Sequence, residues 1–177
     1  GTPLELDAQE AATLLDQTIQ RHFAEKPHNS LKAAMHEIDR RLVTEWLSAY
    51  LEQAAKYGEH WAGFDSPMAA TLFEVSFGRT DGEPDSVGNP LEFVRQGRTY
   101  RIAGRIDRID TGVFAGHNVF NVLDYKTGRS TRLSAENIRQ GTTLQLPLYA
   151  LAASELLLNE NDSIPWQAGY WYVRDSG

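Results

Sequence analysis

Cysteine is absent from this 177-residue sequence. Its absence excludes disulfides, zinc–thiolate sites, iron–sulfur clusters and thiol nucleophiles from the segment. No window approaches the roughly 18 consecutive apolar residues of a membrane span, and the N-terminal residues lack the basic and apolar regions of a signal peptide. Neither a P-loop nor a G-x-S-x-G motif occurs, so P-loop ATP hydrolysis is excluded and serine hydrolysis has no support. We therefore expect a cytoplasmic protein with no membrane association.

Composition sets the size and the charge of the fold. Hydrophobic residues make up 41% of the chain and aromatic residues 10%, which is enough to bury a core within one domain spanning residues 1–177. The net charge is −7, but residues 94–140 hold nine basic and four acidic residues, a local excess of +5. The chain begins at Gly1 and ends directly after a strand-like run. We therefore expect it to be part of a longer protein.

Hydrophobic periodicity predicts an α/β order of elements. Helices are expected over residues 7–26, capped by Asp7, and from Ser30 until Gly58. Strands are expected over 71–77, 91–96, 99–110, 118–126 and 166–173, with the middle three forming an antiparallel meander. Ser134 would cap a helical region in which Pro147 either kinks the helix or marks its true start. The expected organisation is a helical part, 1–60, and a core, 70–175.

Two carboxylates and a lysine could converge near the end of this sheet. Asp124 and Lys126 are two apart in a strand and therefore point to the same side. Asp107 lies on the preceding strand, with a connection short enough to place it alongside. A hard divalent cation stabilises paired carboxylates, and a nearby lysine can orient or activate a water and neutralise charge on a phosphate. The set suits phosphodiester hydrolysis.

Ordinary structural roles remain open for the same residues. An Asp-x-Lys at a strand end is commonly an exposed ion pair worth under about 1 kcal/mol, and Asp107 could belong to an alternating, solvated ladder of charges. Gln145 and Tyr149 are four apart and share a helix face, where one could be a surface residue and the other a core tyrosine. A chance occurrence of these motifs in an unrelated α/β protein would leave Asp107 and Asp124 far apart.

The segments "GRIDRID", "VLDYKTG" and "LQLPLY", in this order and spacing, resemble the nuclease domain of the RecB family in the PD-(D/E)XK superfamily, particularly AddB-type and RecB-like exonucleases. The resemblance implies a restriction-endonuclease-like mixed sheet flanked by helices and a Mg²⁺- or Mn²⁺-dependent deoxyribonuclease acting in DNA repair or recombination. The catalytic residues it implies are Asp107, Asp124, Lys126, Gln145 and Tyr149. It implies metal ligation by Asp107, Asp124 and the main-chain carbonyl of Tyr125.

The resemblance also implies partners for the site. Single-stranded DNA ends are the implied substrate, with a helicase domain or subunit outside this segment. Gln145 and Tyr149 are implied DNA contacts or supports of the site. Arg105 and Arg129 are our first choices for phosphate contacts, and Arg101 and Arg139 are weaker ones. The residues Trp166, Tyr170, Trp171 and Tyr172 could stack bases, although core packing is expected for at least half of them.

The chain departs from the family pattern in two respects. Many relatives bind an iron–sulfur cluster through four cysteines, and this segment has none. The family usually has a histidine metal ligand on an N-terminal helix, where His22 and His36 are the candidates; for both, a surface or packing role is favoured. His117 is interpreted as a loop residue. The alternative function is a catalytically inactive nuclease-fold module that binds DNA or acts as a scaffold within a larger helicase–nuclease.

Overall fold

The computed structural model describes residues 7–24, 29–79, 85–128 and 134–173. Contacts divide the chain into two compact units. One contains the N-terminal helices, and the other contains residues Trp61–Lys126 and Ser130–Trp171. Each unit is considered by itself below, because the predicted site lies in the second. No helix in the described part of the chain is both long enough and apolar enough to span a membrane.

The first unit contains helices α1 (Ala8–His22) and α2 (Ser30–His60). Asp7 caps α1 as predicted: its side chain accepts hydrogen bonds from the backbone N–H groups of Gln9 and Glu10, and the Glu10 carboxylate accepts one from the Asp7 N–H. The prediction that α2 ends at Gly58 is wrong, since the helix continues to His60. A glycine weakens a helix interior by about 1 kcal/mol but does not end it without a left-handed turn.

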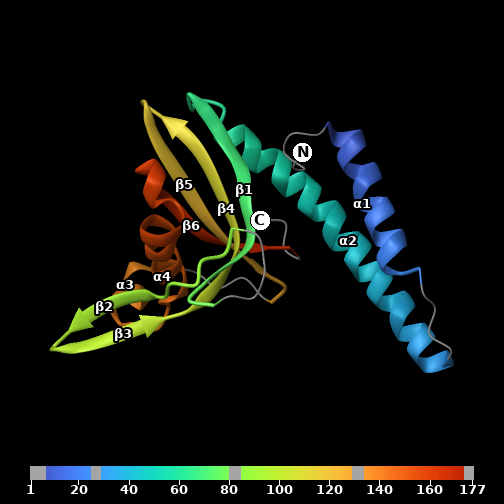
Figure 1. The fold of residues 1–177 in the computed structure, drawn as a ribbon. Helices are drawn as coiled ribbons and strands as arrows, with labels where there is room; N and C mark the ends of the chain where they lie inside the picture. Colours follow the sequence, from blue (N-terminus) through green and yellow to red (C-terminus); the bar gives the residue numbers. More distant parts are fainter. Residues whose placement is uncertain (1–6, 25–28, 80–84, 129–133, 174–177) are drawn as a thin grey trace. The chain divides into compact units, whose positions relative to one another are not determined.

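A four-stranded sheet forms the centre of the second unit (Figure 1). Its strands are β1 (Ser66–Phe77), β4 (Gly104–Phe114), β5 (His117–Lys126) and β6 (Ile164–Tyr172), in the order β1-β4-β5-β6. β4 pairs antiparallel with both β1 and β5. This is the expected mixed α/β sheet. His117 is therefore the first residue of β5, paired with Phe114, and the prediction that it lies in a loop is wrong by one position.

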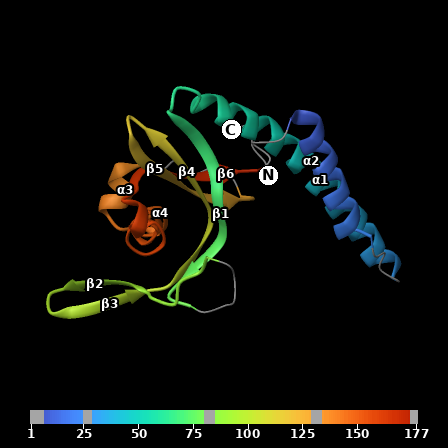
Figure 2. The ribbon, with the colours of Figure 1, turned by 45° about the horizontal axis from the view of Figure 1, so that its top comes forward.

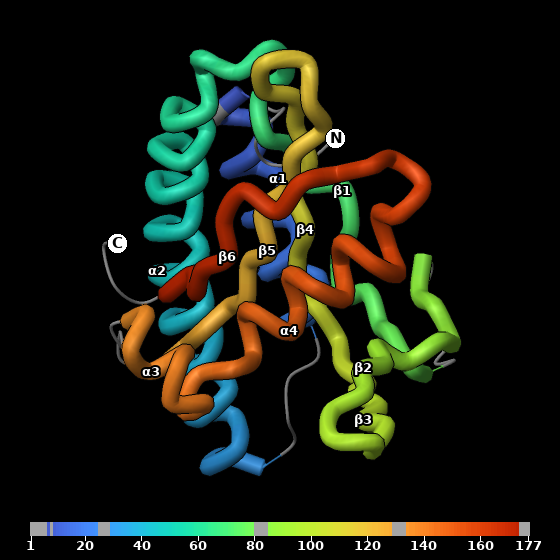
Figure 3. The backbone as a smooth tube through the Cα atoms, turned by 90° about the vertical axis from the view of Figure 1, so that its left-hand side faces the viewer, coloured from blue at the N-terminus to red at the C-terminus, as the bar shows by residue number. Residues whose placement is uncertain are grey.

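Helix α4 (Gln145–Ala152) packs against this sheet, and α3 (Ala135–Arg139) precedes it (Figure 3). Leu146 and Ala152 of α4 join a buried cluster with Phe120 and Val122 of β5. A π-turn (Ala153–Leu157) and a short 3₁₀ turn (Asn159–Asn161) then lead into β6. Pro147 is the third residue of α4, so it marks the true start of the helix, where its missing N–H breaks no intrahelical bond.

The Ser134 cap is confirmed by its side chain. Ser134 Oγ accepts a hydrogen bond from the backbone N–H of Asn137 over 3.1 Å. The helix that it caps is short, ending at Arg139, and a separate turn joins it to α4. The predicted continuous helical region is therefore two helices, and the second begins at Gln145, which places Gln145 and Tyr149 on the first turns of α4.

The strand predicted over residues 99–110 is in fact two strands in different sheets. β3 (Arg98–Ile102) pairs with β2 (Leu91–Arg95) in a two-stranded sheet, and β4 begins at Gly104. The chain changes direction at Ala103, against which Gly78 packs so closely that a Cβ on Gly78 would lie 2.7 Å from that of Ala103. The predicted meander is thus wrong for its first strand, and β1 takes the place beside β4.

Candidate active site

Asp107 and Asp124 lie across from each other at one end of the central strand pair. The β4–β5 ladder pairs Arg108 with Leu123, and the two aspartates occupy the next position. Oδ2 of Asp107 accepts a hydrogen bond from the backbone N–H of Tyr125 over 2.8 Å. The interpretation in which these motifs arise by chance required the two aspartates to be far apart, and the register contradicts it.

Asp124 is a buried carboxylate with two side-chain partners. It is 3% exposed. Its Oδ1 accepts a hydrogen bond from Gln145 Nε2 over 2.7 Å, and its Oδ2 forms an ion pair with the ammonium group of Lys126. Burial raises the pKa of Asp124 above its usual value, the charge of Asp107 raises it further, and the hydrogen bond and charge of Lys126 oppose the rise. The local environment therefore favours a bound positive charge.

Lys126 reaches the site from β5. Its side chain is 37% exposed, and its Nζ lies 5.3 Å from the centre of the Tyr170 ring. Burial acts to lower the pKa of Lys126, but the hydrogen bond and charge of Asp124, with the charges of Tyr170 and Asp107, outweigh it and raise the pKa. The pair with Asp124 is therefore not a fully exposed surface ion pair, because one of its members is buried.

Gln145 and Tyr149 face the site from α4. Beyond its bond to Asp124, Gln145 Nε2 donates to the Tyr149 hydroxyl over 3.4 Å. The Tyr149 ring meets Phe77 edge-on, with centroids 6.1 Å apart. Tyr149 therefore has both a core contact and a hydroxyl directed to the site, and Gln145 joins the helix to the buried carboxylate.

A buried ion pair lies on the opposite face of the sheet, and the sequence reasoning missed it. Arg108 and Asp110, 1% and 0% exposed, form two parallel hydrogen bonds of 2.6 and 2.8 Å. Arg108 Nη1 also donates to the Tyr125 hydroxyl over 3.2 Å, and its guanidinium lies 5.3 Å from the Trp171 ring. The Arg-x-Asp spacing, which puts both side chains on one face of a strand, was the signal available.

This network holds the residue between the two key positions of β5. The phenol of Tyr125 is fixed by Arg108 on one face, while its backbone N–H binds Asp107 at the edge of the site. Burial opposes the charge of Arg108, but its bonds to Asp110 and Tyr125 raise its pKa, so the guanidinium stays charged. The two faces of the sheet are thereby coupled through Tyr125.

The predicted phosphate-binding arginines are mostly engaged with carboxylates. Arg105 pairs with Glu74 over 2.8 Å, and Arg101 with Glu92 over 2.6 Å. Arg139 lies 3.5 Å from Glu136. Arg129 lies outside the described residues. All three described pairs are well exposed, so they exchange readily for phosphate oxygens.

Glu74 was also missed by the sequence reasoning. Between the ladder pairs of its neighbours Phe73 and Val75, Glu74 lies across β4 from Asp107. Its backbone is in the left-handed region, with φ of 53°, which is uncommon for a non-glycine residue within a strand. No sequence pattern signals this conformation.

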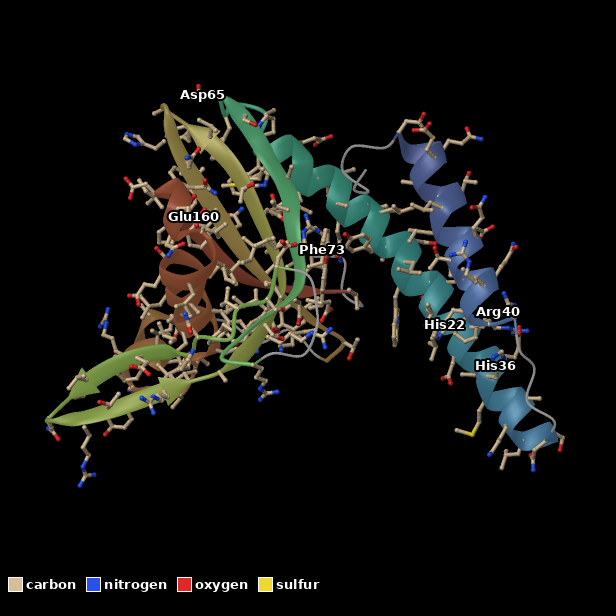
Figure 4. All side chains as sticks on the ribbon, in the orientation of Figure 1. His22, His36, Arg40, Asp65, Phe73 and Glu160 are labelled. Atoms are coloured by element: carbon tan, nitrogen blue, oxygen red, sulfur yellow. The ribbon has the colours of Figure 1, made fainter. Side chains whose placement is uncertain are left out.

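The two helical histidines pack against one aromatic ring. His22 and His36 each lie 5.0 Å from the Phe23 ring, both edge-on, on the helices shown with sticks in Figure 4. This is the packing role favoured from the sequence. Among the aromatic residues of β6, Trp171 is buried, Tyr170 lies beside Lys126, and Trp166 is 45% exposed next to Phe64 and Phe114.

The donor atoms at the site fit a hard divalent cation. Asp107 and Asp124 supply carboxylate oxygens, and Tyr125 between them in the ladder supplies a main-chain carbonyl; Mg²⁺ and Mn²⁺ prefer such oxygen ligands and leave places for water and phosphate. Asp124 Oδ2 is buried and, within the described residues, has the Lys126 ion pair but no hydrogen bond. The described residues include no cluster of three or more His, Cys, Asp or Glu side chains that could hold a metal.

A mixed sheet with an aspartate on each of its two central strands, followed by a lysine two residues on, agrees with the nuclease fold suggested by the motifs. A family model described as the PD-(D/E)XK nuclease superfamily matches residues 2–177. The chain belongs to this superfamily. The restriction-endonuclease-like fold predicted from the motifs is confirmed.

Curated relatives narrow the comparison, and the three described here share one name, as the same subunit of an ATP-dependent helicase/deoxyribonuclease. The protein of Carboxydothermus hydrogenoformans is 39% identical over 103 residues, covering 57% of this chain and 9% of that protein. The protein of Moorella thermoacetica is 31% identical over 160 residues, covering 88% and 13%. That of Exiguobacterium sibiricum is 27% identical over 175 residues, covering 97% and 14%. The chain thus spans about one tenth of the length of these relatives.

Proposed function

We propose that this chain is a divalent-metal-dependent deoxyribonuclease of the RecB and AddB class. The observation that carries the proposal is the meeting of Asp107, Asp124 and Lys126 at one end of β4 and β5, with Gln145 bonded to Asp124. Bound there by Asp107, Asp124 and the Tyr125 carbonyl, Mg²⁺ or Mn²⁺ would supply Lewis-acid polarisation of a phosphate and a water of lowered pKa.

The chain's own residues then have separate tasks. The raised pKa of Lys126 keeps its ammonium group charged near neutral pH, so it donates hydrogen bonds to the attacking water or to the phosphate oxygens, where it neutralises developing charge. Gln145 holds the Asp124 carboxylate in place through Oδ1. Tyr149, whose hydroxyl lies at the same place, holds the nucleic acid strand beside the site together with Gln145.

The substrate that we propose is the end of a single DNA strand, degraded by phosphodiester hydrolysis. The relatives are named as subunits of an ATP-dependent helicase/deoxyribonuclease, which supports a helicase domain or subunit as partner and a role in DNA repair or recombination. Arg105, released from Glu74, is the described arginine nearest to the site in sequence among those predicted to bind phosphate, and it would take a phosphate oxygen in place of the carboxylate.

Degradation of end-labelled single-stranded DNA with Mn²⁺, with Mg²⁺ and with EDTA tests the proposal, using the wild type, Lys126→Ala and, as matched control, Lys32→Ala on the exposed surface of α2. We expect metal-dependent cleavage by the wild type and by the control. The Lys126→Ala variant should lose about 10²–10³ of the rate, as expected for loss of a charge-stabilising donor.

The inactive-module alternative makes the opposite prediction. It is favoured by the fact that the described residues contain no third His, Asp or Glu beside the two aspartates. If the wild type and Lys126→Ala bind DNA equally and neither cleaves it with any metal, the chain is a DNA-binding or scaffold module on the nuclease fold.

A further inference from the structure

The β2–β3 hairpin extends away from the four-stranded sheet (Figures 1 and 2). Its register places three cross-strand pairs on one face: Leu91 with Ile102, Phe93 with Tyr100, and Arg95 with Arg98. The first pair anchors the hairpin, because Leu91 is 1% exposed in the core. The face therefore changes from apolar at the base, through aromatic, to basic at the tip.

The arginine pair at the tip is an unfavourable arrangement for the chain alone. Arg95 and Arg98 are directly opposite each other, and like charges in a cross-strand pair destabilise a hairpin. Both are exposed, and neither has an ion-pair partner among the residues that the structure describes. On the other face, by contrast, Arg101 pairs with Glu92. A polyanion bound between Arg95 and Arg98 would remove the repulsion.

The aromatic pair behind the tip is also exposed. The Phe93 and Tyr100 rings are stacked, with centroids 5.4 Å apart and an interplanar angle of 14°, and they are 38% and 44% exposed. A two-stranded hairpin buries little surface by itself, so its own stability does not require exposed rings. Stacked rings beside these two arginines match a nucleic acid strand, whose bases stack and whose phosphates need cations.

The hairpin is joined directly to the strand that carries the candidate active site. Tyr100 is seven residues before Asp107, so at about 3.3 Å per residue their backbones are at most about 23 Å apart. A single strand held at Asp107 and Asp124 can therefore reach the hairpin. Duplex DNA, whose bases are already stacked on each other, offers no free base to the aromatic pair.

We propose that this face of the β2–β3 hairpin is a single-stranded DNA-binding arm of the nuclease. Phe93 and Tyr100 stack with a base, and Arg95 and Arg98 bind the adjacent phosphates, which holds the strand as it enters the site. The inference rests on the proposed function, since the bound DNA is the substrate of that site.

Fluorescence anisotropy with a labelled oligonucleotide of about 20 nucleotides, in EDTA so that no cleavage occurs, tests the arm. The variants are Arg95→Gln/Arg98→Gln and Tyr100→Leu, with Arg101→Gln as matched control on the opposite face of the same hairpin. The double arginine variant should reduce the slope of log affinity against log salt by about 1.4, two phosphates at about 0.7 each. Tyr100→Leu should weaken single-strand binding about tenfold and duplex binding much less. Circular dichroism checks that each variant is folded.

The outcomes separate the arm from the nuclease. If the wild type binds and cleaves but both hairpin variants keep its affinity and salt slope, the arm is wrong and the nuclease stands. If the variants lose binding as expected while the wild type cleaves nothing with Mn²⁺ or Mg²⁺, the arm stands and the nuclease is wrong. A wild type that binds no single-stranded DNA contradicts the arm.

Discussion

Gln145, on the helix after the sheet, donates a hydrogen bond from Nε2 to Oδ1 of the buried Asp124 on β5, over 2.7 Å. This bond joins the third sequence motif to the second and holds a carboxylate whose burial disfavours its charged form. Hydrogen bonding to the ionised form compensates part of that cost.

Replacing Gln145 with leucine should destabilise the fold by about 1–3 kcal/mol at neutral pH, because a buried carboxylate oxygen loses its donor. Cleavage should fall as well, since Asp124 is no longer held in place. Urea unfolding at pH 7 measures the first effect. Gln140→Leu is the matched control, because Gln140 bonds only to the exposed Glu136 among the side-chain contacts described; an equal loss in both variants would contradict the account.

The buried charge of Asp124 should make stability depend on pH. Its pKa in the folded protein is raised above the usual 3.8, so above that pH the folded state binds more protons than the unfolded state, and stability falls as pH rises through the raised pKa. Asp124→Asn should therefore be more stable than the wild type at pH 7, by about 1 kcal/mol, when metal is removed with EDTA.

The same variant should lose this advantage in acid. Below pH 3.8 the wild-type carboxyl is protonated in both states, and the two proteins should unfold at similar urea concentrations. A stability difference that stays constant between acid and neutral pH would show that burial of the Asp124 charge is not its cause.

The ion pair behind the site should tolerate loss of both charges better than loss of one. Arg108→Met leaves the fully buried Asp110 without its cation and should cost about 3–5 kcal/mol. Arg108→Met/Asp110→Leu should recover much of this loss in urea unfolding. If the double variant is as unstable as the single one, contacts of Arg108 with Tyr125 and Trp171 matter more than the ion pair.

Gly104 should not accept a side chain without moving the site. An added Cβ would lie 2.9 Å from the Phe77 ring and 3.0 Å from the Tyr149 ring, and Tyr149 is bonded to Gln145. Gly104→Ala should cost about 1–3 kcal/mol and slow cleavage. Gly169→Ala in β6 is the control, since nothing lies within 4 Å of its added Cβ, and thermal unfolding compares the two.

The sequence predicted the site better than the sheet that carries it. The two-residue spacing of Asp124 and Lys126, with a short connection back to Asp107, was enough because strand periodicity and hairpin pairing are local rules. The break at Ala103 was not predictable, since residues 99–110 read as one alternating strand; close packing against Gly78, distant in sequence, causes it. Burial of Arg108 and Asp110 was also missed, because such residues are almost never fully buried unless paired.

Mn²⁺ binding in the absence of DNA, followed by electron paramagnetic resonance at neutral pH, tests the central claim most directly. We predict about one bound ion per wild-type chain, lost in Asp107→Asn and in Asp124→Asn and retained in Asp85→Asn, whose carboxylate is exposed outside the site. Binding that is unchanged in both site variants, or absent from the wild type, would contradict the proposal that Asp107 and Asp124 hold the catalytic metal.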